Sequence, residues 1–163
     1  MRVAAFVLAV VACASTPPAS DAPKFMVKGV AQRSGQYCGG AAPSPEMIKQ
    51  AQTPRVTTER FDVLRGKGAD GELVTSFNPD TKGQFSVSLP PGDYCVTEAG
   101  KREVPKNGDG MYVDAACMKQ WRASCSLVWH VDAKDIDGSF TLASPCFGPC
   151  YRGPMPPAAA PHR

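Results

Sequence analysis

Histidine and tryptophan are scarce in this sequence of 163 residues, which contains two of each. The sequence has no G-x-S-x-G nucleophile elbow, no H-E-x-x-H zinc motif, no Walker loop and no dinucleotide-binding glycine pattern. His130 lies inside a strand pattern and His162 lies beside the C-terminus, positions that favour a solvent-facing or structural role. We therefore expect no enzymatic activity, no catalytic residue and no cofactor.

Long runs of like charge and long apolar runs are also missing. The formal net charge is +3, and no cluster of basic residues is long enough to follow a phosphate backbone, so a nucleic acid is not an expected partner. The longest apolar run, Val3 to Ala14, has twelve residues. A membrane-spanning helix needs about 20, so this run is too short to cross a bilayer.

The composition favours a single loop-rich β domain. The chain is 43% apolar and contains 15 glycines and 16 prolines, which argues against both a helical bundle and disorder. Its length suits one sizeable core. Its seven cysteines are an odd number, and they are many for a cytosolic protein of this size.

The N-terminus has the features of an export signal. Arg2 supplies a positive charge, and an apolar stretch follows and ends at small residues. At that end, Val10-Val11-Ala12-Cys13 resembles the lipobox of bacterial lipoproteins. The resemblance implies that residues 1–12 are a signal peptide and that Cys13 becomes a lipidated N-terminus, carrying a diacylglycerol and an acyl chain such as palmitate.

The same resemblance implies a location at the outer membrane, because Ala14 follows the cysteine where aspartate would favour the inner membrane. Several acyl chains together anchor a protein stably. An alternative is that residues 12–14 form an A-x-A cleavage site, which would release a secreted or periplasmic protein beginning at Ser15. Either processing event leaves six cysteines.

Three further segments follow the signal. Residues 13–24 are rich in proline and serine and predict a flexible linker. Residues 25–143 carry the strand patterns of a β-sandwich domain. Residues 144–163 form a Cys/Pro-rich C-terminal tail.

About seven short strands are predicted, the first over Phe25–Gln32. Apolar residues then alternate with polar ones in a period of two, the mark of a half-buried strand, and Gly, Pro, Asn and Asp clusters separate the runs. The alternating apolar residues are Phe61 and Val63, Leu73 and Phe77, Phe85, Val87 and Leu89, then Leu127, Trp129 and Val131. Further strands are predicted over Tyr94–Glu98 and Ser139–Leu142. This spacing predicts an all-β, antiparallel two-sheet sandwich, transthyretin-like or Ig-like.

One or two short helices are predicted outside the strands. In the insertion that follows Gln32, Ser44-Pro45-Glu46 supplies a cap, a proline at the first helical position and an acid in the first turn. Asp114–Trp121 has the features of a second capped helical turn.

The segment from Gly83 to Val96 resembles the transthyretin-like, or carboxypeptidase-regulatory-like, domain pattern G-x-F-x-V-x-L-P-P-G-x-Y-x-V. Gly29-Val30 and Phe61-Asp62-Val63 match its first two strands, and the resemblance extends from Val27 to Ala99. It implies a structural or interaction module. From the residues themselves, the two prolines end one strand, Gly92 forms the turn and Tyr94 re-enters the sheet as an amphipathic plug.

The remaining cysteines predict three disulfides. They are Cys38, Cys95, Cys117, Cys125, Cys146 and Cys150. We expect Cys117 to pair with Cys125, and Cys38 to pair with one of the two tail cysteines. An alternative is a metal-binding or redox role for the Cys146 and Cys150 pair, with His130 as an added ligand.

The sequence therefore predicts a non-enzymatic, lipid-anchored lipoprotein of the cell envelope. Its partners would be the membrane, through the anchor, and an envelope protein or glycan. The aromatic residues Tyr112, Trp121 and Tyr151 are candidates for a binding platform.

Overall fold

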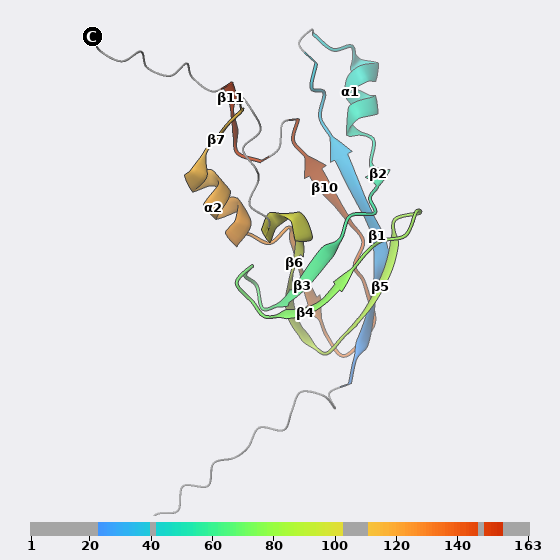
Figure 1. Cartoon of the computed structure of the whole chain (residues 1–163). Helices are drawn as coiled ribbons and strands as arrows, with labels where there is room; N and C mark the ends of the chain where they lie inside the picture. The colour runs from blue at the N-terminus through green and yellow to red at the C-terminus, as the bar shows by residue number, and fades with distance from the viewer. Residues whose placement is uncertain (1–22, 40–41, 103–110, 147–148, 155–163) are drawn as a thin grey trace, which may run out of the picture.

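The computed structural model describes residues 23–39, 42–102, 111–146 and 149–154. Its strands are β1 (Phe25–Gly35), β2 (Arg55–Val56), β3 (Phe61–Arg65), β4 (Leu73–Phe77), β5 (Gln84–Leu89), β6 (Gly92–Glu98), β7 (Met111–Val113), β8 (Leu127–Val131), β9 (Ile136–Asp137), β10 (Phe140–Ser144) and β11 (Tyr151–Pro154). The helices are α1 (Pro45–Gln52) and α2 (Ala115–Ala123), with a 3-10 turn at Ala99–Arg102. The expected all-β two-sheet sandwich is confirmed, with both helices outside the sheets (Figure 1).

One sheet is antiparallel and has four strands in the order β4-β3-β6-β8. The second sheet is built around the long strand β1. The first half of β1 pairs antiparallel with β5 and parallel with β9, and its second half pairs antiparallel with β2 and parallel with β10. The two parallel pairings depart from a purely antiparallel pattern because the chain crosses from β8 in one sheet to β9 and β10 in the other.

β1 is longer than the sequence predicted. It continues past Gln32 through Gly35, because Arg33 and Gly35 pair with Leu142 and Ser144 of β10. Apolar alternation ends at Gln32, so the sequence of residues 33–35 gives no local indication that the strand continues. The extension places Arg33 inside a strand, opposite Leu142 of β10 and Arg55 of β2. Figure 1 shows that this end of β1 lies beside α1.

The core lies between the two sheets and is rich in aromatic rings. Phe77 stacks on Phe85 with ring centroids 4.5 Å apart, and both rings lie 5.7 Å from Trp129. Phe61 stacks on Phe77 and meets Phe140 edge-on. Burial in β5 alternates residue by residue, as the period-two pattern predicted.

Tyr94 has the role expected of it at the strand entry. Its side chain is fully buried, and its hydroxyl donates a hydrogen bond of 2.6 Å to the carbonyl oxygen of Pro90. Burial raises the pKa of the Tyr94 hydroxyl. The apolar ring thus packs in the core while its polar end is satisfied at the turn.

Both predicted helices are present and are capped at the expected residues. The Ser44 hydroxyl accepts a hydrogen bond from the amide of Met47 at the start of α1, and Pro45 takes the first helical position. The Asp114 carboxylate accepts one from the amide of Cys117 at the start of α2. Among the described residues, no helix is long and apolar enough to cross a membrane.

Candidate functional site

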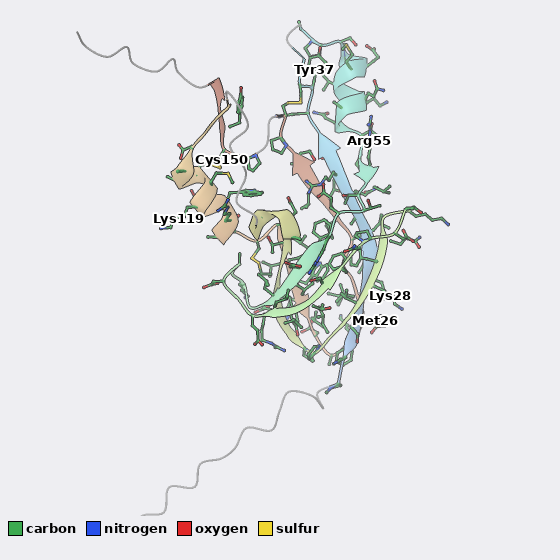
Figure 2. The ribbon with its side chains drawn as sticks, in the orientation of Figure 1. Met26, Lys28, Tyr37, Arg55, Lys119 and Cys150 are labelled. Atoms are coloured by element: carbon green, nitrogen blue, oxygen red, sulfur yellow. A yellow bond between two sulfur atoms is a disulfide. The ribbon has the colours of Figure 1, made fainter. Side chains whose placement is uncertain are left out.

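Three disulfides are present, and they involve all six cysteines predicted to form them. The bonds are Cys38–Cys146, Cys95–Cys125 and Cys117–Cys150. Cys38 therefore pairs with a tail cysteine, as expected. Figure 2 shows Cys150 beside α2, the helix that carries its partner Cys117. Cys13 lies outside the described residues.

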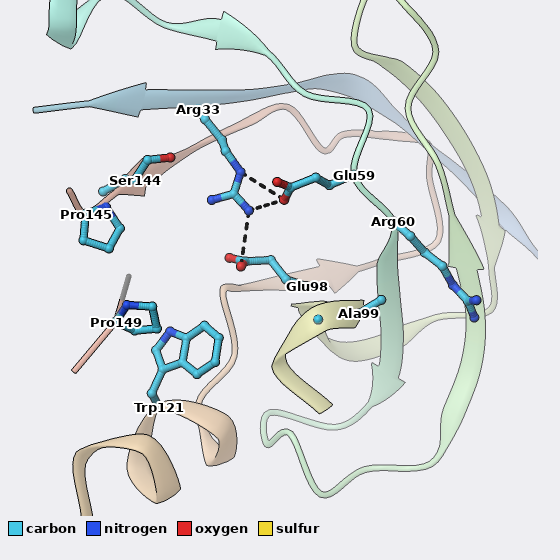
Figure 3. A pocket seen from close by; sticks show the side chains of 11 residues that line it. Arg33, Glu59, Arg60, Glu98, Ala99, Trp121, Ser144, Pro145 and Pro149 are labelled. Atoms are coloured by element: carbon cyan, nitrogen blue, oxygen red, sulfur yellow. Dashed lines mark hydrogen bonds and ion pairs between the residues drawn. The ribbon is translucent and has the colours of Figure 1, made fainter. Parts of the chain in front are cut away.

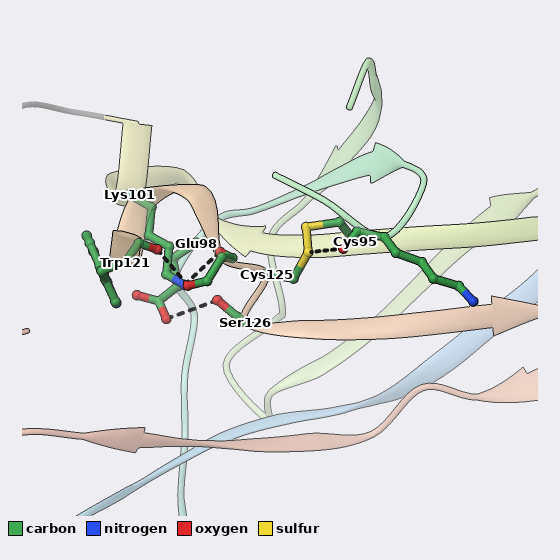
Figure 4. The surroundings of a disulfide bond; sticks show 8 residues. Cys95, Glu98, Lys101, Trp121, Cys125 and Ser126 are labelled. Carbon is green, nitrogen blue, oxygen red and sulfur yellow. Dashed lines mark hydrogen bonds between the residues drawn. A yellow bond between two sulfur atoms is a disulfide. The ribbon is translucent and has the colours of Figure 1, made fainter. Parts of the chain in front are cut away.

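The predicted pairing of Cys117 with Cys125 is wrong. Residues 115–123 form one helix, and at about 1.5 Å of rise per residue its length alone takes Cys117 beyond the roughly 7 Å that a disulfide allows between Cα atoms. Cys125 instead meets Cys95, because β8 follows it directly and pairs with β6 (Figure 4). The alternation of β6 turns Cys95 away from the core side chains of Tyr94 and Val96.

The metal or redox alternative assigned Cys146 and Cys150 to one pair, but the structure separates them. Each sulfur is bonded to a different partner, Cys38 or Cys117. Among the described residues, no group of three His, Cys, Asp or Glu side chains is placed to hold a metal ion. His130 is thus not brought together with these two sulfurs.

His130 belongs to an exposed charged cluster. Its Nδ1 lies 2.7 Å from a carboxylate oxygen of Asp93, and its Nε2 lies 3.0 Å from Asp132. The hydrogen bond to Asp93 and the charges of both carboxylates raise the pKa of His130, and the hydrogen bond from His130 lowers the pKa of Asp93. The two carboxylates engage opposite edges of the ring, so the cluster is an ion-pair network on the surface of the sheet.

The tail segment that begins at Pro145 is fixed at two points. It leaves β10 at Ser144, and Cys146 ties it to the segment that follows β1 while Cys150 ties it to the first turn of α2. We call the described residues of this segment, 145–146 and 149–150, the strap. A cleft of about 580 Å³ lies between the strap, α2 and the ends of β1 and β6 (Figure 3). Its lining residues are Arg33, Glu59, Arg60, Glu98, Ala99, Gly100, Trp121, Ala143, Ser144, Pro145 and Pro149.

Arg33 is the central polar group of this cleft. Its guanidinium forms an ion pair with Glu59 through Nε and Nη2, and Nη2 also lies 3.2 Å from a carboxylate oxygen of Glu98. Burial alone would lower the pKa of Arg33, but the hydrogen bond to Glu59 and the two negative charges outweigh it and raise that pKa. The side chain is therefore charged and held in one orientation.

Trp121 forms the aromatic wall. It lies on α2, is half-buried, and has the ammonium of Lys101 5.0 Å from its ring centroid. Lys101 also donates a hydrogen bond of 3.2 Å to the carbonyl oxygen of Ser124 (Figure 4). Burial lowers the pKa of Lys101, and the nearby charge of Glu98 opposes this shift. The ammonium of this buried lysine thus lies over one face of the ring.

The sequence analysis singled out Trp121 but not the charged residues beside it. Arg33, Glu59 and Glu98 come from β1, from the approach to β3 and from the end of β6, so no local motif joins them. Of the other two aromatic candidates, Tyr151 is half-buried on β11, and the side chain of Tyr112 lies outside the described residues.

Comparison of the chain with protein-family models, with curated proteins and with solved structures found no match.

Proposed function

We propose that this protein is a non-enzymatic binding module of the bacterial cell envelope, lipid-anchored through Cys13, which takes its ligand in the cleft beside the strap. The fold alone does not define this function, because β-sandwiches serve many roles. The observation that carries the proposal is the cleft itself: a concave site with a charged centre, an aromatic wall and a strap fixed by two disulfides.

The chemistry of the lining supports binding rather than catalysis. The described residues that line the cleft include no Cys, His or Lys, and both of its carboxylates bind Arg33. Fixed polar groups in a largely apolar cavity are typical of sites that orient a small ligand. Three disulfides support an oxidising compartment such as the periplasm or the cell surface.

The position of the cleft suits an anchored protein. The linker predicted over residues 13–24 leads directly into β1, which begins at Phe25. Arg33 lies eight residues further along the same strand, roughly 25 Å away at the rise of an extended chain. The cleft is therefore at the end of β1 remote from the point where the proposed linker enters the domain.

The anchor is tested on the protein produced in a bacterial host with its own N-terminus. We expect partition into the detergent phase and a lipid-modified N-terminal peptide in the mass spectrum. The variant Cys13→Ser should lose both, with the disulfide-bonded domain unchanged. An unmodified terminus at Ser15 in the aqueous phase would contradict the anchor and favour the secreted or periplasmic alternative.

The cleft is tested by site-specific photo-crosslinking in intact envelopes. A photoreactive amino acid is placed at Pro145, which is exposed and lines the cleft, and in a control at Ser86, which is exposed on β5 away from it. We expect an adduct from position 145 and none from position 86. Equal labelling from both positions, or none from position 145, would contradict binding at the cleft.

A further inference from the structure

The polar and aromatic groups of the cleft define a particular class of ligand. We infer that the site binds an uncharged saccharide, with a pyranose ring against Trp121 and neighbouring hydroxyl groups on Arg33 and Glu59. This inference rests on the proposed binding function and names the ligand chemistry of the same site.

Charge is the first argument. Arg33 lies between Glu59 and Glu98, and the buried ammonium of Lys101 lies close enough to Glu98 for their charges to interact. Arg60, which also lines the cleft, forms an ion pair with Asp62. Figure 3 shows its side chain directed away from Arg33. Positive and negative charges are thus already matched, and a charged ligand would lose its hydration without gaining an unpaired partner.

Hydrogen-bonding capacity is the second argument. The contacts to the two carboxylates use Nε and Nη2 of Arg33, and within the described part of the chain Nη1 takes no part in them. Figure 3 shows the guanidinium between these carboxylates on one side and Ser144 on the other. Glu59, with 55% of its side chain exposed, presents carboxylate oxygens at the mouth. Forked donors and acceptors of this kind match pairs of adjacent hydroxyl groups.

A purely apolar ligand fits this lining poorly. It would remove water from Arg33 and Glu59 without replacing their hydrogen bonds, which costs binding free energy. A polyhydroxyl ligand supplies both donors and acceptors, so its hydroxyl groups can replace the hydrogen bonds that the displaced waters made to these side chains.

The flat side-chain rings that line the cleft are the third argument. Trp121, Pro145 and Pro149 present flat, stiff apolar rings around the polar centre. The face of a pyranose that carries only C–H groups packs well on such rings, and Trp in particular supplies binding energy at low entropic cost. Lys101 on the indole keeps this wall in place before any ligand arrives. The volume of about 580 Å³ is that of a site for a small molecule or a short oligosaccharide.

The experiment uses the anchored protein, purified in a zwitterionic detergent that has no sugar headgroup. The chain has two tryptophans, Trp121 in the cleft and Trp129 in the core, so ¹⁵N-labelled protein gives two indole signals that Trp121→Phe assigns. Neutral glucose-, galactose- and N-acetylglucosamine-based oligosaccharides are titrated separately. We expect at least one of them to shift the Trp121 signal with saturation while leaving the Trp129 signal in place.

Glu59→Gln is the test variant, because it keeps the shape of the side chain and removes the charged acceptor. We expect its affinity for the bound oligosaccharide to fall about tenfold or more. Glu72→Gln, an exposed residue next to β4 and outside the lining, is the matched control and should bind as the unchanged protein does.

The outcomes separate this inference from the proposed function. If no neutral oligosaccharide shifts the Trp121 signal, or if Glu59→Gln and Glu72→Gln bind equally, the saccharide inference is wrong. Specific crosslinking from position 145 would still support a binding module with another ligand. If the bound oligosaccharide is hydrolysed, the ligand class is correct and the non-enzymatic proposal is wrong.

Discussion

The sandwich core and the layer outside it are held together by different means. In the core, Phe61, Leu89 and Tyr94 are fully buried, and the Phe85 ring stacks across the two sheets on Phe77 and Trp129. Outside it, α1 buries no residue at all and α2 buries only Met118. These outer segments are instead fastened by Cys38–Cys146 and Cys117–Cys150. Burial thus organises one part of the chain, and covalent links organise the other.

The candidate site lies where these two parts meet. Arg33 and Glu98 are on core strands, whereas Trp121, Pro145 and Pro149 belong to the outer layer. A ligand in the cleft would therefore contact both. The difference teaches that the site depends on two kinds of interaction, core packing for Arg33 and Glu98 and disulfides for the strap.

The largest effect is expected in the core. Phe61→Ala removes a fully buried ring that contacts Phe77 and Phe140, and it should lower the free energy of unfolding by about 3–5 kcal/mol. The control Ile48→Ala, on the exposed face of α1, should change it by less than about 0.5 kcal/mol. Urea denaturation measures both. Similar losses in the two variants would remove the distinction between core and outer layer.

The next effect concerns the outer disulfides. Replacing Cys38 and Cys146 by alanine opens a link between residues 108 apart in sequence, and releasing the unfolded chain from this restraint should cost about 2–5 kcal/mol. Cys117–Cys150 spans 33 residues, so its double alanine variant should lose about 1 kcal/mol less. Urea midpoints of the two variants give the comparison.

This second prediction sharpens the contrast between the two regions. If loss of Cys38–Cys146 loosens the strap but leaves the urea midpoint unchanged, the disulfide fastens only its own segments. A fall in the midpoint shows that a link outside the core also stabilises the core, through the unfolded state.

The smallest effect is expected at the exposed cluster around His130. The pKa of His130 is raised above 6.5 by folding, so its favourable contribution is fully present below pH 6.5 and is lost as the pH rises through the raised value. Asp93 has a lowered pKa, and its contribution is lost as the pH falls below 3.8. His130→Asn should therefore reduce stability more at pH 6 than at pH 9. Thermal unfolding at the two pH values measures this, and an equal loss at both would contradict it.

Local patterns in the sequence predicted both helices and the seven longer strands of the sandwich, but not the short strands β2, β7, β9 and β11. The alternation of Phe85, Val87 and Leu89 identified a strand with one buried face, and Ser44 identified a helix start from its cap chemistry. These signals are local because each depends on backbone geometry over a few residues.

What the sequence did not predict depends on contacts between distant segments. The extension of β1 to Gly35 comes from pairing with β10, about a hundred residues later. The partner of Cys125 was missed because it depends on β8 lying beside β6. Arg33, Glu59 and Glu98 converge for the same kind of reason, and nothing in their immediate neighbours distinguishes them from ordinary surface charges.

The position of the strap late in the sequence indicates when the site is completed during folding. Every strand of the two sandwich sheets precedes Pro145 in the chain, whereas the strap follows the last of these strands and is fixed by disulfides to Cys38 and Cys117. A chain exported from its N-terminus would thus form its sandwich first and complete its cleft last. A protein in which the two disulfides of the strap have not formed would therefore lack a complete cleft, whatever the state of its sandwich.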